Sequence, residues 1–218
     1  MYYVLPSSKR QSRLKAGQYI GTFEERFAHL HQKAERLIRC FGVYGEPLPL
    51  WRRFKNRFWD SLEYWVLPPA VQKRINDRSL VLSPLFGIAS VESPIPEYHF
   101  GWEDICEGVK VKDYWIQDIK NLTRKLFEGK KVVLFVGKET ALLELSTAER
   151  VITFEYYRGE KKVRNPMRHR AFTLRYIAEM DLALEDFSKI NFYDYSVNDV
   201  IQKGKKILFV LRSEGRYI

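Results

Sequence analysis

Apolar residues recur every three or four positions in several stretches of this chain, a spacing that predicts amphipathic helices. The expected helices cover residues 24–41, 49–66, 112–127, 138–148, 166–180 and 184–190. Gly42, the pair Pro68-Pro69 and Gly129 end the first three of them. Asn165 and Pro166 are a typical helix start, because Asn caps free N–H groups and Pro needs no donor there.

Short apolar runs between these helices predict strands. The run 131–136 is the clearest, and its continuous apolar character predicts a central strand that is covered on both faces. Further strands are expected at 2–5, 79–82, 151–156 and 206–211. Strands and helices alternate in the second half, so we expect one α/β domain over 1–218, a mixed sheet flanked by helices.

The charge of the chain favours an acidic partner. Its 218 residues include 37 Lys and Arg against 27 Asp and Glu, which gives a net charge of +10 with neutral histidines. Nucleic acid is the commonest partner of such a surface, because each phosphate contact releases a counterion. A basic surface without any nucleic-acid partner fits the charge equally well.

No apolar run approaches the roughly 20 residues that a membrane helix needs, so no membrane partner is expected. The N-terminus turns polar by Pro6, unlike a secretory signal. Two cysteines, Cys40 and Cys106, cannot form a disulfide framework or a zinc site on their own. We therefore expect a cytoplasmic protein with reduced thiols, and no protein partner is indicated.

Common phosphate and metal motifs do not occur in their usual form. Gly137-Lys138 follows an expected strand, as in a phosphate-binding loop. However, Glu139 takes the place of the Ser or Thr after Lys, and Val132 takes the place of the earlier Gly. The four histidines lack metal-ligand spacing with the cysteines, so neither a metal nor another cofactor is expected.

Two basic segments are candidates for phosphate contacts. The first lies around the polar side of the expected helix 49–66 and contains Arg52, Arg53, Lys55 and Arg57. The second surrounds the helix that begins at Asn165 and contains Lys161, Lys162, Arg164, Arg168, Arg170 and Arg175. The positive end of that helix adds to its cations. The alternatives are a solvated helix face for the first segment and neutralisation by acidic neighbours for the second.

A third candidate is the glycine turn between the first two expected helices. A helix, a short turn from Gly42 to Gly45 and a second helix follow one another here, which is the arrangement of a helix-hairpin-helix element. Backbone N–H groups around such glycines can bind a phosphate. The alternative is an ordinary connection between two helices.

The segments Ser83 to Ile88 and Pro94 to His99 resemble the S-G-L-Y-G-L and I-P-P-Y-R signatures of the YaaA peroxide-stress protein family. Three further segments resemble parts of that family and occur in the same order along the chain: the N-terminal loop Pro6 to Lys9, the pair Tyr114-Trp115, and Glu139. In the family's basic helix motif, Arg168, Arg170 and Arg175 match the second Lys and both Arg. The chain departs from the charged positions of the family at Ser90, Ser93, His99 and Met167.

The resemblance implies a cytoplasmic protein linked to peroxide resistance and to limiting free iron. It also implies an α/β domain with a basic cleft, a helix-hairpin-helix-like element and binding to duplex or distorted DNA. The primary hypothesis is therefore a DNA-binding stress protein without catalytic residues, in which the three basic candidates contact the backbone without reading sequence.

The alternative hypothesis is an enzyme that acts on a phosphate-bearing small molecule or a nucleobase. Its candidate residues come from loops and helix starts, where α/β sheets commonly hold ligands: Lys9, Ser83, Tyr98, Glu139 and Arg170. Glu139 is the candidate general base, and Tyr98 or Lys9 an acid or an anion anchor. A compact pocket that joins these residues favours the enzyme, and a long open basic groove favours DNA. An interaction protein without chemistry is a third possibility, which a large exposed aromatic patch would support.

Overall fold

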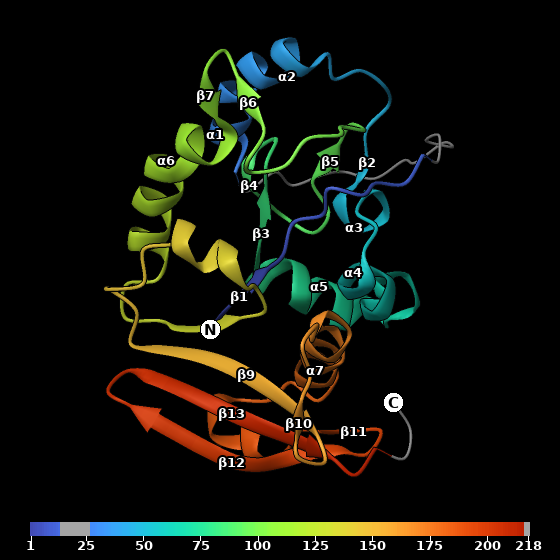
Figure 1. Ribbon diagram of the computed structural model, residues 1–218, viewed down its shortest axis with the longest axis vertical. Helices are drawn as coiled ribbons and strands as arrows, with labels where there is room; N and C mark the ends of the chain where they lie inside the picture. The colour runs from blue at the N-terminus through green and yellow to red at the C-terminus, as the bar shows by residue number, and fades with distance from the viewer. Residues whose placement is uncertain (14–26, 216–218) are drawn as a thin grey trace.

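The computed structural model describes residues 1–13 and 27–215, and its main feature is a mixed sheet of nine strands (Figure 1). The strands are β1 Tyr2–Leu5, β3 Ser79–Ser83, β4 Gly87–Ala89, β8 Lys131–Leu134, β9 Arg150–Arg158, β10 Lys161–Lys162, β11 Asn191–Phe192, β12 Tyr195–Lys203 and β13 Lys206–Ser213. Their order is β11-β12-β13-β9-β8-β1-β3-β4, and β10 pairs with β9. Helices flank the sheet, so the α/β fold predicted from the sequence is confirmed.

The centre of this sheet is parallel. β1 lies between β3 and β8, and Val4 pairs with Leu80 on one side and with Leu134 on the other. β8, β9 and β13 continue the parallel arrangement. Residues 132–136 are buried, as expected of a strand that is covered on both faces. The prediction of a central strand here is confirmed, with the strand itself ending at Leu134.

Ten helices occur in the described part of the chain. The α-helices are α1 Ala28–Lys33, α2 Glu35–Phe41, α3 Leu50–Arg53, α4 Arg57–Leu62, α5 Pro69–Arg78, α6 Val111–Leu126 and α7 Met167–Glu179. The 3-10 helices are η1 Tyr64–Val66, η2 Lys138–Leu142 and η3 Leu184–Lys189. In Figure 1, α6 lies on one side of the central strands, and α4, α5 and α7 lie on the other. None of the described helices is long and apolar enough to cross a membrane.

The prediction of one continuous helix over 49–66 is wrong, because three short helices, α3, α4 and η1, occupy this segment. The backbone of Phe54 is extended, and Lys55 donates its N–H to the Arg10 carbonyl instead of continuing a helix. Asn56 then starts α4 by accepting the N–H groups of Phe58 and Trp59 with its side chain. A local side-chain cap thus competes with the helical pattern of apolar residues.

Other expected boundaries also change. The helix expected over 24–41 is divided at Ala34, and its first three positions lie outside the described residues. The helix expected over 138–148 is only the 3-10 helix η2. Pro69 occupies the first turn of α5, so the proline pair starts a helix as well as ending one. The nine-residue strand β12 was not predicted.

The glycine turn after α2 is followed by strand rather than by a long helix. Gly42 ends α2 in the left-handed conformation, and its N–H donates to the Arg39 carbonyl. The chain then forms β2 Leu48–Pro49, which pairs with β5 Pro94–Ile95. The expected helix-hairpin-helix therefore has its first helix and its turn, but only the one-turn α3 as its second helix.

Candidate active site

A cleft opens where β1 and β8 end, at the carboxyl edge of the parallel strands. The chain places β3 on one side of β1 and β8 on the other, so the loops after β1 and β8 separate at this point. Such topological switch points commonly bind ligands in α/β proteins. The cleft has a volume of about 600 Å³ and is lined by Ser7, Lys9, Pro84, Gly101, Trp102, Glu103, Asp104, Lys112, Lys138, Glu139, Ala141 and Leu142.

Glu139 is held in this cleft by three hydrogen bonds. Ser7 donates both its backbone N–H, at 3.2 Å, and its hydroxyl to Oε1 of Glu139. Trp102 donates its indole N–H to the same oxygen at 3.1 Å. No described residue donates a hydrogen bond to Oε2, so that oxygen is available to a ligand in the cleft.

The loop that carries Ser7 is fixed from the opposite side. Asn56 donates its side-chain amide to the Ser7 carbonyl at 3.0 Å, and Trp59 donates its indole N–H to the Pro6 carbonyl at 3.1 Å. Asn56 and Trp59 belong to the start of α4. The same Asn56 cap that interrupts the expected long helix therefore also positions the loop beneath the carboxylate of Glu139.

Burial raises the pKa of Glu139 above its ordinary value. The hydrogen bonds from Ser7 and Trp102, and the positive charge of Arg170, act in the opposite direction because they stabilise the carboxylate. A carboxyl group whose pKa moves toward neutrality can hold or release a proton under ordinary conditions. Glu139 therefore has the position and the environment of a proton-transfer group.

The rim of the cleft carries charges of both signs. Lys9 pairs with Asp104 at 3.0 Å, and Lys112 pairs with Glu103 at 2.9 Å. Lys138 is exposed and has no ion pair with any residue between 1 and 13 or 27 and 215. Lys138 thus offers an uncompensated positive charge next to Glu139.

The five candidate residues of the enzyme hypothesis occupy neighbouring positions, but only Lys9 and Glu139 line the cleft. Ser83 and Tyr98 are buried behind it, with their hydroxyl oxygens 3.4 Å apart. Burial raises the pKa of Tyr98, the hydrogen bond from Ser83 opposes this, and the nearby Glu139 adds to the increase. Tyr98 is therefore a neutral buried support rather than an acid that reaches a ligand.

Arg170 is partly buried behind the cleft, against the segment that follows β8. Its Nη1 atom lies 3.4 Å from the Phe135 carbonyl oxygen, and a side chain at Gly137 would come within 3.7 Å of it. Burial lowers the pKa of Arg170, and the charges of Tyr156 and Glu139 oppose that effect. Arg170 therefore supports the negative charge of Glu139 from behind the site.

Sequence reasoning did not select Ser7, Trp102 or Lys138 for this site. Ser7 and Lys138 each follow a buried strand, a position that α/β sheets use for ligand contacts. Trp102 lies in a loop between β5 and α6 and gave no such signal, because only the fold brings its indole to Glu139.

The predicted DNA-binding residues are dispersed and differ in their surroundings. Lys161, Arg164 and Arg168, which we call the basic edge, are exposed, and none of them has an ion pair in the described part. Lys162 pairs with Glu155, and Arg175 pairs with both Glu63 and Glu179. Acidic neighbours thus neutralise part of the second basic segment, as its alternative interpretation expected.

The first basic segment is also divided between buried and exposed side chains. The prediction that Arg53 contacts phosphate is corrected by its burial. Its side chain is 2% exposed, and it donates hydrogen bonds to the carbonyls of Ser12, Glu46 and Ile95. It cannot contact a phosphate from there, because Arg53 lies three positions after the buried Leu50 and shares the inward face of α3 with it. Arg57 is exposed, while Arg52 and Lys55 line a second hollow and Lys55 approaches Asp60 at 3.7 Å.

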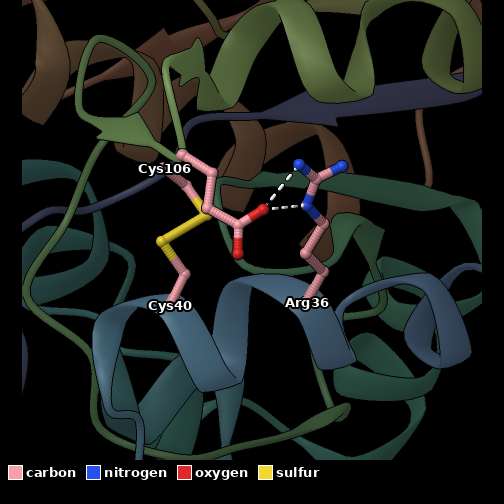
Figure 2. Close-up of a disulfide and its surroundings, with 4 residues drawn as sticks. Arg36, Cys40 and Cys106 are labelled. Atoms are coloured by element: carbon pink, nitrogen blue, oxygen red, sulfur yellow. Dashed lines mark hydrogen bonds and ion pairs between the residues drawn. A yellow bond between two sulfur atoms is a disulfide. The ribbon is translucent and has the colours of Figure 1, made fainter.

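The two cysteines are bonded to each other, which corrects the expectation of reduced thiols. Figure 2 shows Cys40 at the end of α2 joined to Cys106, with their Cα atoms 6.0 Å apart. Cys106 belongs to β6 Ile105–Cys106, which pairs with β7 Val109–Lys110. Because 66 positions separate the two residues, their spacing gave no sign of the pair.

This disulfide links α2 to the segment that directly follows Gly101 to Asp104, the residues that form one wall of the cleft. Beside it, Arg36 of α2 donates two hydrogen bonds to Glu107, as the dashed lines in Figure 2 show. Phe41 also stacks on Phe100 with ring centroids 4.1 Å apart. The wall from Gly101 to Asp104 lies between these anchors, so α2 supports the loop that carries Trp102.

Comparison with models of known protein families finds no match, and no curated protein matches the sequence. The resemblance to the YaaA family therefore stays a prediction. Among the described residues, no group of three or more His, Cys, Asp or Glu could hold a metal ion.

Proposed function

We propose that this chain is an enzyme that acts on a small molecule with a phosphate group and a planar base, held in the cleft at Glu139. The observation that carries the proposal is the arrangement of Glu139, whose Oε1 accepts three hydrogen bonds while Oε2 is available to a ligand. Fixing one oxygen leaves the other in a defined position, which a proton-transfer group requires.

Each part of the ligand has a suitable contact. The ammonium group of Lys138 is available for phosphate, and Lys9 is close to the same space. The half-buried indole of Trp102 offers a surface for a planar base. Oε2 of the Glu139 carboxylate then takes a proton from the ligand, or Glu139 in its protonated form returns one to it, and Arg170 favours the carboxylate form. The cleft is lined by three lysines and three carboxylates, so its charges cancel and give no net attraction for a long polyanion.

The test is isothermal titration of the protein with adenosine 5′-monophosphate, adenine and inorganic phosphate as probes. We expect the nucleotide to bind at least tenfold more tightly than either fragment. Lys138→Ala should weaken nucleotide binding about tenfold, which corresponds to about 1.4 kcal/mol. Glu139→Gln should retain binding but remove the part of its pH dependence that Glu139 contributes, since Gln does not titrate while the phosphate of the nucleotide still does.

The matched control is Arg168→Ala, which removes one exposed cation outside the cleft. Its affinity for the nucleotide should equal that of the unmodified protein. Equal weakening by Lys138→Ala and Arg168→Ala would show general charge attraction and contradict the proposal. Absence of binding by all three probes at millimolar concentration would contradict it as well.

DNA binding is the second candidate function, favoured by the net charge of +10 and the uncompensated cations of the basic edge. Its test is binding to a labelled duplex, with and without a bulge, over a salt series. Replacing Lys161, Arg164 and Arg168 with Ala should reduce the slope of log affinity against log salt by about 0.9 per lost contact. Arg175→Ala is the control, because two carboxylates already occupy Arg175. Unchanged affinity and slope in the triple variant would reject this candidate.

A further inference from the structure

Strand β12 has an outer edge that is largely unpaired in the described part of the chain. On one side it pairs with β13 from Ser196 to Lys203. On the other side the two-residue strand β11 reaches only Tyr195 and Ser196. Residues 197–203 therefore present their outward N–H and carbonyl groups at the rim of the sheet, at the bottom of Figure 1. Such an edge is a template for pairing with another strand.

The side chains of this edge include two large apolar groups. Val200 is 45% exposed and Ile201 is 40% exposed. Asp199, Ile201 and Lys203 share one face of the strand, because successive side chains alternate between faces. The edge thus carries a negative charge, an apolar group and a positive charge in a row with equal spacing.

We propose that two copies of this chain pair through β12, antiparallel and centred on Ile201. In that register Asp199 of each copy lies opposite Lys203 of the other, and the two Ile201 side chains meet at the two-fold axis. Opposite charges across antiparallel strands stabilise a pair, and like charges destabilise it. The row of three residues is self-complementary, which a two-fold interface requires. A second copy fits this edge better than a peptide of unrelated sequence for that reason.

The backbone supports the same register. The N–H of Val200 does not reach β13 but donates to the side chain of Asp199 at 2.8 Å. Val200 and Gln202 are therefore the residues whose backbone groups face outward, and the register places them opposite each other across the two copies. Pairing transfers the Val200 N–H to the carbonyl of the second copy and releases Asp199 to contact Lys203. Each copy contributes only one strand to this interface, and the buried area is therefore small. The dimer should form only at high protein concentration for that reason.

A charge exchange tests this register by analytical ultracentrifugation over a concentration series. Lys203→Glu places two carboxylates opposite each other at both ends of the pair and should weaken dimerisation at least tenfold. The double variant Asp199→Lys and Lys203→Glu restores opposite charges and should recover it. Lys161→Glu is the matched control, because it changes the net charge equally but lies on β10, which pairs with β9 rather than with β12. Failure of the double variant to recover the dimer would overturn the register.

Cross-linking tests the centre of the pair without depending on charge. Ile201→Cys should form a disulfide-linked dimer on mild oxidation, since directly opposite residues in antiparallel strands lie within disulfide range. Val200→Cys should not form one, because its counterpart is Gln202. A monomer at every concentration, or equal cross-linking of both variants, would overturn the proposal. None of these results depends on a ligand in the cleft, so they stand or fall separately from the proposed function.

Discussion

The cleft and the basic edge contain similar charged residues but give them different environments. In the cleft, Glu139 is largely enclosed, its Oε1 accepts three hydrogen bonds, and Arg170 lies behind it. At the basic edge, Lys161, Arg164 and Arg168 are exposed and have no ion pair among the described residues. Solvent and salt screen the exposed charges, whereas burial strengthens each interaction of the enclosed ones.

This difference separates two kinds of function. An enclosed carboxyl group with a raised pKa can transfer a proton to a ligand in a fixed position. Exposed cations attract any polyanion, and their effect depends on their number more than on their positions. The sequence supplied both sets of residues, so only their burial distinguishes a site for chemistry from a surface for electrostatic attraction.

The largest effect is expected for the disulfide, which supports the cleft and has no counterpart at the basic edge. Replacing Cys40 and Cys106 with Ser should lower the free energy of unfolding by about 4 kcal/mol, since the bond closes a loop of 66 residues. Urea unfolding with and without dithiothreitol measures this. The reductant should have no effect on the double Ser variant. Equal stability of the oxidised and reduced protein would show that the bond does not support the fold.

A slightly smaller effect is expected for Arg53, the buried member of a basic segment. Arg53→Ala removes the hydrogen bonds that Arg53 donates to three carbonyl groups and should destabilise the protein by about 3 kcal/mol. Arg52→Ala, next to it but partly exposed, should change stability by less than about 0.5 kcal/mol. Thermal and urea unfolding of the two variants provide the comparison. Equal losses would mean that burial does not distinguish these two arginines.

A pH effect of up to about 3 kcal/mol is expected for His169, which is buried between Tyr156 and Tyr195. Burial, and then the charges of Arg158 and Arg168, lower the pKa of His169 to about 4, below 6.5 in the unfolded chain. The unfolded chain therefore binds the proton more readily in this window, so stability falls as the pH drops from 6.5 to 4.

The measurement is urea unfolding between pH 4 and 7. His169→Phe should have a smaller loss of stability in this window, because Phe does not titrate. Carboxyl groups titrate in both proteins, so the difference between the two pH curves isolates the contribution of His169. Identical curves would show that His169 takes up no proton on unfolding in this window.

The smallest effect is expected for Trp102, which supplies one of the three hydrogen bonds to Glu139. Trp102→Phe keeps an aromatic ring but removes the indole N–H, and should destabilise the protein by about 1 kcal/mol. The pKa of Glu139 should increase further, because this hydrogen bond stabilises the carboxylate. Carbon-13 NMR of the Glu139 carboxyl group over a pH series measures the shift. A lower pKa in the variant would contradict the assigned role.

The sequence alone determined the elements whose residues interact locally or are buried on all sides. The apolar run at 131–136 predicts the central strand, because a strand covered on both faces needs no polar residues. Helix α6 follows its periodic apolar positions, and Gly42 ends α2 in the left-handed conformation that favours glycine. Alternation of strands and helices also predicts the α/β class.

The tertiary structure decided the features that depend on contacts between distant residues. The partners of Glu139 come from positions 132 and 37 residues away, and Cys40 pairs with Cys106 over 66 residues. Arg52 and Arg53 look alike in the sequence, yet only Arg53 lies on the inward face of α3 together with Leu50. Spacing along the chain records periodicity and local caps, but burial and charge pairing depend on which segments the sheet brings together.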